Sequence, residues 1–147
     1  MTRKDFIKTS GFAAAVAAMP AMAQGGERVI RAAVVGCGGR GVGGSSKPKN
    51  ENDFYAMGAL GNMMQAAAAL TKRGTPVKAV PVAFADFFLE KAQAAAEKFG
   101  GKKENAYGGA NGYKQAIDRP DVDVVILTTP LNFRPRHTMF AVQRGKH

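Results

Sequence analysis

The chain has little cysteine, few acidic residues and no long apolar run. Cys37 is the only cysteine, so no disulfide can form within the chain. Lysine and arginine outnumber aspartate and glutamate by 21 to 11, for a formal net charge of +10. The basic residues are scattered, and their densest clusters, 47–49 and 101–103, have no interleaved aromatics, which argues against a nucleic-acid partner. We expect a solvated basic exterior and an anionic ligand.

The N-terminus has the pattern of an export signal. A basic head precedes the small apolar run Gly11–Met19, which is far short of the roughly 20 residues that span a bilayer, so no stable membrane anchor is expected. The "AMA" at 21–23 has the form of a cleavage site, and we predict a signal peptide over 1–23 and a periplasmic, bacterial location. The segment "TRKDFIK" resembles the twin-arginine signal, with Lys4 in place of the second arginine. An ordinary secretory signal and an uncleaved helix are the alternatives.

Strand and helix patterns alternate along residues 24–147. The residues from 41 to 61 have a loop composition, and Asn62 could cap the helix that follows. Pro81 cannot donate to a sheet, so we expect a bulge there or an irregular start of the strand. The expected strands are 28–35, 77–86, 105–109 and 121–130, and the expected helices are 62–73, 88–100, 112–120 and 134–147. This order predicts an α/β domain with a doubly wound parallel sheet of Rossmann type, its last strand covered by helices on both faces.

A glycine-rich motif follows the first expected strand. It reads G-x-G-x-x-G, the fingerprint of a dinucleotide-binding turn, and its residues are Gly36, Gly38, Gly39, Arg40 and Gly41. The first glycine permits the tight turn, the second lets the backbone reach a pyrophosphate, and the third lets the next segment pack on the strand.

The fingerprint also requires an acid at the end of the second strand. Asp86 ends "VAFAD", but it lies about 50 residues after Gly36, whereas the usual acid lies about 20 beyond the glycines. Asp53 has the better spacing but follows no strand. We therefore predict Asp86 as the ribose-binding acid and an insertion near 43–61, with a simple helix N-cap as the alternative for Asp86.

Three pieces of the chain together resemble the Gfo/Idh/MocA family of oxidoreductases. They are "RAAVVGCGGRG", "VAFADFFLEKAQAAAEKFG" and "DVDVVILTTPLNFRPRHTMFAVQRGKH". The resemblance implies an NAD(P)-dependent oxidoreductase that acts on sugars or cyclitols. It assigns the glycine motif to the pyrophosphate and Asp86 to the ribose. It places another group of residues near the nicotinamide side of the cleft: Thr128, Thr129, Pro130, Asn132 and His137.

Some of these residues have simpler roles open to them. His137 could be a helix-surface or capping residue, and Arg40 could face solvent instead of phosphate. Cys37 lies in the cradle, where a small side chain is needed for packing.

Nothing in the chain matches the family's catalytic lysine. In the family "GKH" is followed by a strand, a Glu-Lys-Pro motif and a substrate domain, whereas this chain ends at His147. We assign no catalytic or metal-binding residue and expect a C-terminally truncated cofactor-binding domain. It would be inactive alone, and it would meet a sugar-like substrate only with a second domain. The alternatives are a non-catalytic exported nucleotide-binding or structural remnant and, from another class, an S-adenosylmethionine methyltransferase.

The last expected strand leaves a sheet edge without a partner. In a sheet of order 3-2-1-4 that continues, the fourth strand is interior. Here Val122–Thr128 is apolar and β-branched, and such an edge templates pairing with another chain. We therefore expect self-association, which light scattering after size-exclusion chromatography measures.

We predict that the chain binds NADH more tightly than NADPH. Asp86 would repel a 2′-phosphate, and Phe87 and Phe88 follow it with no arginine to receive one. Titration of the chain with each cofactor, followed by nicotinamide fluorescence, measures both affinities. NADPH binding as tight as NADH binding would contradict this assignment.

Overall fold

The computed structural model describes residues 26–44, 50 and 53–147. The predicted signal peptide, 1–23, lies outside these residues, and so does part of the segment 43–61. Within the described ranges, no helix is long and apolar enough to cross a membrane.

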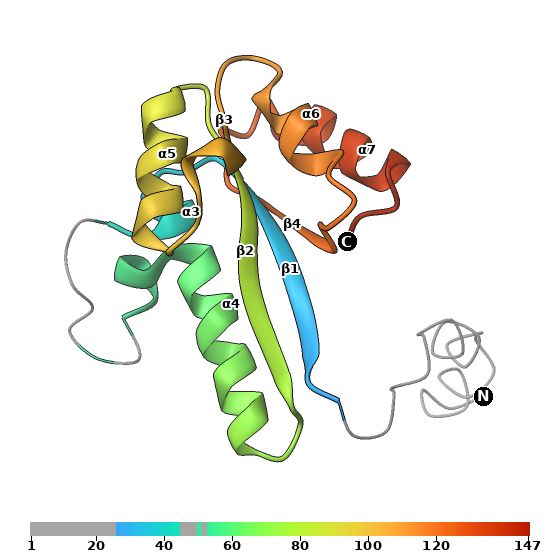
Figure 1. Ribbon diagram of the computed structural model, residues 1–147. Coiled ribbons are helices and arrows are strands. Elements are labelled where there is room, and N and C mark those ends of the chain that lie inside the picture. Colours follow the sequence, from blue (N-terminus) through green and yellow to red (C-terminus); the bar gives the residue numbers. More distant parts are fainter. Residues whose placement is uncertain (1–25, 45–49, 51–52) are drawn as a thin grey trace, which may run out of the picture.

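The core of the fold is a four-stranded sheet in which every neighbouring pair is parallel (Figure 1). The strand order is β3-β2-β1-β4, which is the order of a Rossmann-type sheet and confirms the predicted fold class. The strands are β1 (Arg28–Val35), β2 (Val77–Ala85), β3 (Ala106–Tyr107) and β4 (Val124–Leu127).

Helices cover both faces of the sheet. In Figure 1, α3, α4 and α5 lie on one side of the strands, and α6 and α7 lie on the other. The helical elements are α3 (Gly39–Val42), α4 (Phe54–Lys72), α5 (Leu89–Lys98), the 3-10 turn η1 (Lys103–Asn105), α6 (Gly112–Ile117) and α7 (Arg134–Gln143).

The alternation of side chains along β1 divides the core into two layers. Ala32 and Val34 pack in the cluster that includes alanines of α5, whereas Ala33 and Val35 pack with Ile117 of α6. Side chains of successive strand residues point to opposite faces, so one short apolar strand serves both layers. The small alanines let the helices approach the sheet closely.

A bulge in β2 lies where the sequence predicts one. Ala32 of β1 pairs with Pro81, but Ala33 pairs with Ala83, so Val82 is an extra residue in β2. Proline has no N–H for the ladder, and the bulge relieves that missing bond.

The loop predicted over 41–61 is wrong at 41–42 and 54–61, which are helical, and the predicted helix start at Asn62 is also wrong. α3 begins at Gly39, within the glycine motif, and α4 begins at Phe54, capped by Asp53, whose Oδ1 accepts from the Ala56 N–H at 3.3 Å. Asn62 lies inside α4. The residue that interrupts α4 is Gly58, with φ 66° and ψ 178°. Helix propensity alone did not predict this part of α4, because it contains this glycine and polar residues precede it.

The chain leaves α3 and returns to α4 at nearly the same point. A Cβ on Gly43 would lie 2.0 Å from the carbonyl oxygen of Ala56, and one on Gly58 would lie 2.2 Å from the amide nitrogen of Gly43. Only glycine at both positions allows this contact, because both residues also have positive φ. As a result, α3 stops after one turn.

β4 is shorter and less buried than the sequence predicts. The expected strand covered 121–130 with both faces buried, but Val124–Leu127 are all partly exposed, because β4 lies outermost among the described strands. The expectation that its outer edge has no partner is also wrong where the backbone of His147 lies beside Asp123 and Val125. The Val125 N–H donates to His147 O at 2.7 Å, and the His147 N–H donates to Asp123 O at 3.0 Å. Self-association itself stays a prediction.

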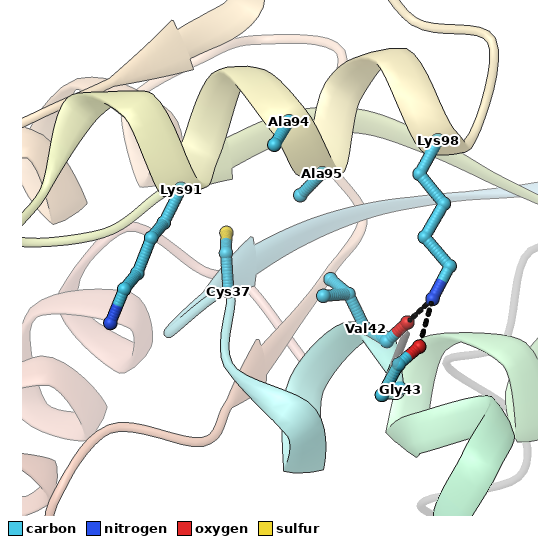
Figure 2. Close-up of a pocket in the computed structure, with 8 residues that line it drawn as sticks. Cys37, Val42, Gly43, Lys91, Ala94, Ala95 and Lys98 are labelled. Atoms are coloured by element: carbon cyan, nitrogen blue, oxygen red, sulfur yellow. Dashed lines mark hydrogen bonds between the residues drawn. The ribbon is translucent and has the colours of Figure 1, made fainter. Parts of the chain in front are cut away.

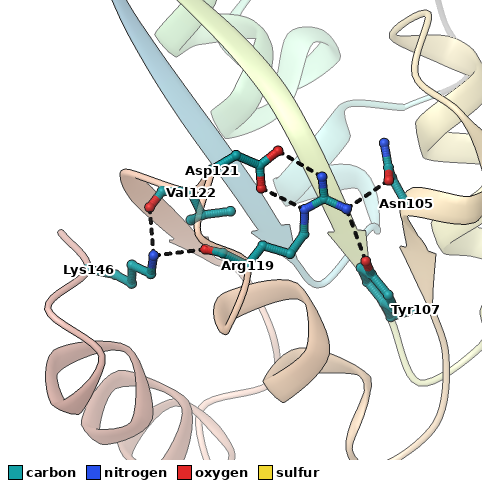
Figure 3. A network of polar contacts seen from close by, with 6 residues as sticks. All are labelled: Asn105, Tyr107, Arg119, Asp121, Val122 and Lys146. Carbon is teal, nitrogen blue, oxygen red and sulfur yellow. Dashed lines mark hydrogen bonds and ion pairs between the residues drawn. The ribbon is translucent and has the colours of Figure 1, made fainter.

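A network of polar contacts surrounds Arg119, in the turn before β4 (Figure 3). The Arg119 guanidinium donates to both carboxylate oxygens of Asp121, at 2.8 and 2.7 Å, and to Asn105 Oδ1 and the Tyr107 hydroxyl, at 2.8 and 3.1 Å. The Lys146 Nζ donates to the carbonyl oxygens of Arg119 and Val122, both at 2.9 Å. The network therefore joins β3, the turn before β4 and the end of the chain.

We predict that Gly41→Ala destabilises the fold and that Gly39→Ala does not. A Cβ on Gly41 would lie 2.1 Å from Gly36 O and 2.7 Å from Thr128 Oγ1, whereas one on Gly39 meets nothing within 4 Å. Overpacking of this kind costs about 1–3 kcal/mol, and each kcal/mol lowers Tm by about 2–4 °C in a domain of about 150 residues. Thermal unfolding followed by circular dichroism measures the difference. Equal melting temperatures for the two variants would contradict the packing described here.

Candidate functional site

The glycine motif forms a loop that is closely packed on one side and open on the other. Gly36 has φ 99°, and a Cβ there would lie 2.8 Å from the Thr129 N and 2.9 Å from the Thr128 side chain. Around Gly38 and Gly39, in contrast, nothing lies within 4 Å of an added Cβ. The loop therefore presses on the end of β4 while its middle stays free for contact with a ligand.

Two side chains from neighbouring strands hold this loop. Thr128, directly after β4, donates its hydroxyl to Gly36 O at 2.6 Å. Asp86, directly after β2, accepts from the Cys37 N–H at Oδ2, at 2.8 Å, and from the Phe88 N–H at Oδ1, at 3.1 Å. The second bond closes a turn just before α5, whose N-cap is Phe88 with no side-chain cap bond, so Asp86 is not the N-cap of that helix. Each carboxylate oxygen keeps capacity for a further hydrogen bond.

These residues border a cavity of about 580 Å³ at the carboxyl ends of β1, β2 and β4. In an open parallel sheet this is the edge at which ligands bind. Seven of the residues that the sequence singled out line the cavity: Gly36, Gly38, Asp86, Thr128, Thr129, Pro130 and His137. The remaining four, Gly39, Arg40, Gly41 and Asn132, do not line it. Gly41 is buried beneath the loop, and the other three are exposed.

His137 lines the cavity and is buried. Its side chain is only 8% exposed, its Nδ1 lies 3.2 Å from Thr129 Oγ1, and its ring lies 4.1 Å from that of Tyr113, centroid to centroid. Burial, and secondarily the charge of Arg136, lower the pKa of His137 below its ordinary value of 6.5. At neutral pH His137 is therefore an uncharged imidazole, and the reading as an exposed helix-surface residue does not hold.

The loop after β4 is also fixed through its backbone. Arg134, at the start of α7, donates its Nε to the carbonyl oxygen of Thr129 at 2.7 Å. Together with the contact between Thr129 and His137, this bond sets the position of the cavity wall opposite Asp86.

Several cavity residues have no motif in the sequence. The walls also include residues that the sequence reading did not single out: Phe87, Phe88, Lys91, Tyr113, Phe133 and Arg136. Phe133 lies four residues before His137, a spacing that places two residues on one face of a helix, whereas Arg136 is the sequence neighbour of His137 and no such spacing indicates it. Tyr113 comes from α6, and only the tertiary fold brings it to the site.

A second cavity of about 460 Å³ lies behind the loop, between α3 and α5 (Figure 2). Cys37 lies on its wall, and burial, with a smaller contribution from the charge of Asp86, raises the pKa of its thiol to about 12. Such a thiol is protonated at neutral pH and unreactive, which agrees with a packing role. Lys98 also lines this cavity and donates to the backbone of Val42 and Gly44.

Among the residues that the structure describes, no group of three or more His, Cys, Asp or Glu side chains is arranged to hold a metal ion.

No family model and no curated protein matches the chain. Solved structures do match it. The NAD binding oxidoreductase from Klebsiella pneumoniae is 25% identical, with a TM-score of 0.55 over 80% of this chain and 26% of that one. Levoglucosan dehydrogenase, in a complex with NADH and levoglucosan, is 22% identical, with a TM-score of 0.54 over 82% of this chain and 26% of that one.

These likenesses agree with the sheet order and with the glycine loop. The chain has the Rossmann-type fold found in NAD-binding oxidoreductases, and it spans about a quarter of the length of the solved structures that it matches.

We predict that the stability of the fold falls below about pH 6.5 because of His137. Its pKa is lower in the folded chain than in the unfolded chain, so acidification protonates the unfolded state first. The contribution of His137 to the free energy of unfolding is therefore fully present above pH 6.5. As the pH falls toward the pKa of His137 in the folded chain, this contribution decreases by at most about 1.4 kcal/mol per pH unit. Melting temperatures between pH 5 and 8 should become less dependent on pH in His137→Gln.

The other histidine, His147, is exposed and provides the control. In His147→Gln, the melting temperature should depend on pH as it does in the wild-type chain. If His137→Gln and the wild-type chain have the same pH profile, His137 does not carry the effect.

Proposed function

We propose that this chain is the nicotinamide-dinucleotide-binding part of an oxidoreductase. The observation that carries the proposal is the cavity that joins the open middle of the glycine loop to the Asp86 carboxylate and the loop after β4. A dinucleotide needs these features in this order: a backbone without Cβ atoms for the pyrophosphate, an acid for the ribose, and a mixed apolar and polar wall beyond.

The residues of the cavity fit such a ligand. At Gly38 and Gly39 an added Cβ would occupy the open side of the loop, which is the space that a pyrophosphate needs. Asp86 is anchored by two backbone N–H groups, so its carboxylate is already oriented for the hydroxyls of a ribose. We assign the nicotinamide side to Thr128, Thr129, Pro130 and the neutral His137, which lie across the cavity from Asp86.

A bound nicotinamide would supply the hydride chemistry, and the protein would supply binding and orientation. Proton transfer to or from a substrate oxygen would still need a placed acid or base, and we assign that role to no residue of this chain. The similarity to part of larger NAD-binding oxidoreductases supports the assignment to the Gfo/Idh/MocA family, with a sugar-like substrate that meets the cofactor only beside a second domain.

We also propose that NAD is preferred to NADP and that the protein is exported to the periplasm. The first rests on the negative charge of Asp86 in the cavity. The second rests on the sequence of residues 1–26 alone, and fractionation of bacteria that express the chain, with immunodetection in the periplasmic fraction, tests it. Retention of the full-length chain in the cytoplasm would contradict export.

We predict that Asp86→Ala weakens NADH binding by roughly 1–3 kcal/mol, because the ribose hydroxyls lose a charged acceptor. Fluorescence titration of the full chain measures the affinity, and S-adenosylmethionine is titrated in parallel to test the methyltransferase alternative. Glu104→Gln removes a carboxylate that is exposed and outside the cavity, so it should leave the affinity unchanged.

The variants also separate binding from folding. Asp86→Ala removes two hydrogen bonds to the backbone, so its melting temperature is measured beside its affinity. If a folded Asp86→Ala binds NADH as the wild type does, Asp86 only ties the loop to the turn before α5. Absence of NADH binding by the wild-type chain would refute the proposed function and favour the non-catalytic alternative.

A further inference from the structure

The end of α3 is stabilised by a side chain from another helix. α3 is four residues long, and the chain leaves it at Gly43, so no further helical turn is present to bond the carbonyl groups at its end. Lys98 of α5 takes the place of that turn. Its Nζ donates to Val42 O at 2.7 Å and to Gly44 O at 3.1 Å, as Figure 2 shows for the groups near the second cavity.

Lysine suits this position for two reasons. Its ammonium group has three donors on a flexible stem, so one side chain can serve two carbonyl oxygens. Its positive charge also strengthens both hydrogen bonds, because a charged donor bonds a carbonyl oxygen more strongly than a neutral donor does. The contact spans from residue 98 to residues 42 and 44, so only the packing of α5 against the loop creates it.

Lys98 completes a set of three contacts around the glycine loop. Thr128 after β4 holds Gly36, and Asp86 after β2 holds Cys37, both at the beginning of the loop. Lys98 holds the other end, at Val42. The stretch between these points includes Gly38 and Gly39, where nothing lies within 4 Å of an added Cβ and the backbone is therefore open to a ligand. Their positions are therefore fixed from both ends.

We propose that Lys98 is a positioning residue for pyrophosphate binding. It touches no ligand in this arrangement and acts through α3, by keeping the loop amides in place although the helix behind them is interrupted. The proposal rests on the proposed dinucleotide-binding function, and it adds a residue that lies outside the glycine fingerprint and outside the cavity of 580 Å³.

The first test compares ligands with and without a pyrophosphate. In the full chain, Lys98→Met should raise the Kd of NADH and of ADP-ribose about tenfold, since bonds from a charged donor are lost. The Kd of adenosine, measured by calorimetry, should change less than about twofold. Lys98→Arg keeps a charged donor and should restore the affinity for NADH to within about threefold of the wild type.

Lys103→Met is the matched control. Lys103 of η1 forms an ion pair with Glu97 of α5 at 2.7 Å, and its side chain is exposed. Its replacement by methionine removes one positive charge, as the replacement of Lys98 does. NADH affinity should be unchanged in it. An unchanged affinity in Lys98→Met, or an equal loss for adenosine, would overturn the proposal, because the first shows no positioning and the second shows a general disturbance of the fold.

The second test needs no ligand. Amide hydrogen exchange of the free chain should be about tenfold faster at 41–43 in Lys98→Met than in the wild type, with β1 and β2 unchanged. Unchanged exchange at 41–43 would refute the positioning role. If exchange is faster in Lys98→Met but the wild-type chain does not bind NADH, the contact of Lys98 with α3 is established. The proposed function and the role of Lys98 in binding are then both refuted.

Discussion

A Cβ atom on Gly41 would lie 2.1 Å from Gly36 O, and one on Gly36 would lie 2.8 Å from Thr129 N. The loop after β1 can reach the end of β4 only because neither position has a side chain. This close approach lets Thr128 bond Gly36 O, brings β4 beside β1, and leaves the middle of the loop facing the cavity. The arrangement of the candidate site follows from this steric constraint.

The interruption of the helix after the loop changes how an anion can be held. A helix macrodipole needs several aligned turns, and α3 has a single turn before the chain leaves it at Gly43. Side chains from β2, β4 and α5 keep the loop in place instead: Asp86, Thr128 and Lys98. The site therefore depends on long-range contacts where an uninterrupted helix would depend on local ones.

The lining of the cavity includes four aromatic side chains beside His137, and two basic ones. The His137 ring lies 4.1 Å from that of Tyr113 and 6.2 Å from that of Phe133, centroid to centroid. This burial keeps His137 uncharged, so the charge near the wall comes from Arg136 and Lys91. Such a lining can contact a flat ring and an anionic group at once, and a dinucleotide has both, in its bases and in its pyrophosphate.

Much of the fold could be predicted from the sequence because its signals are local. The apolar run of β1, the glycines after it and the proline that forces the bulge in β2 each act within a few residues. The prediction was wrong over 54–61, because Asp53 caps a helix that Gly58 then interrupts, and propensity alone reads that stretch as a loop. It was also wrong at the edge of β4, where the backbone of His147 pairs through contacts that no local pattern encodes.

The sequence by itself determined the parallel α/β class, the glycine fingerprint and the choice of Asp86 over Asp53, since each follows from residue type and local order. Only the tertiary structure decided which of these residues share a cavity. It brought Tyr113 and Lys91 to the cavity, left Arg40 and Asn132 outside it, and placed Lys98 at the end of α3. The physical reason is that these contacts join residues distant in the chain, and their geometry is set by how helices pack on the sheet.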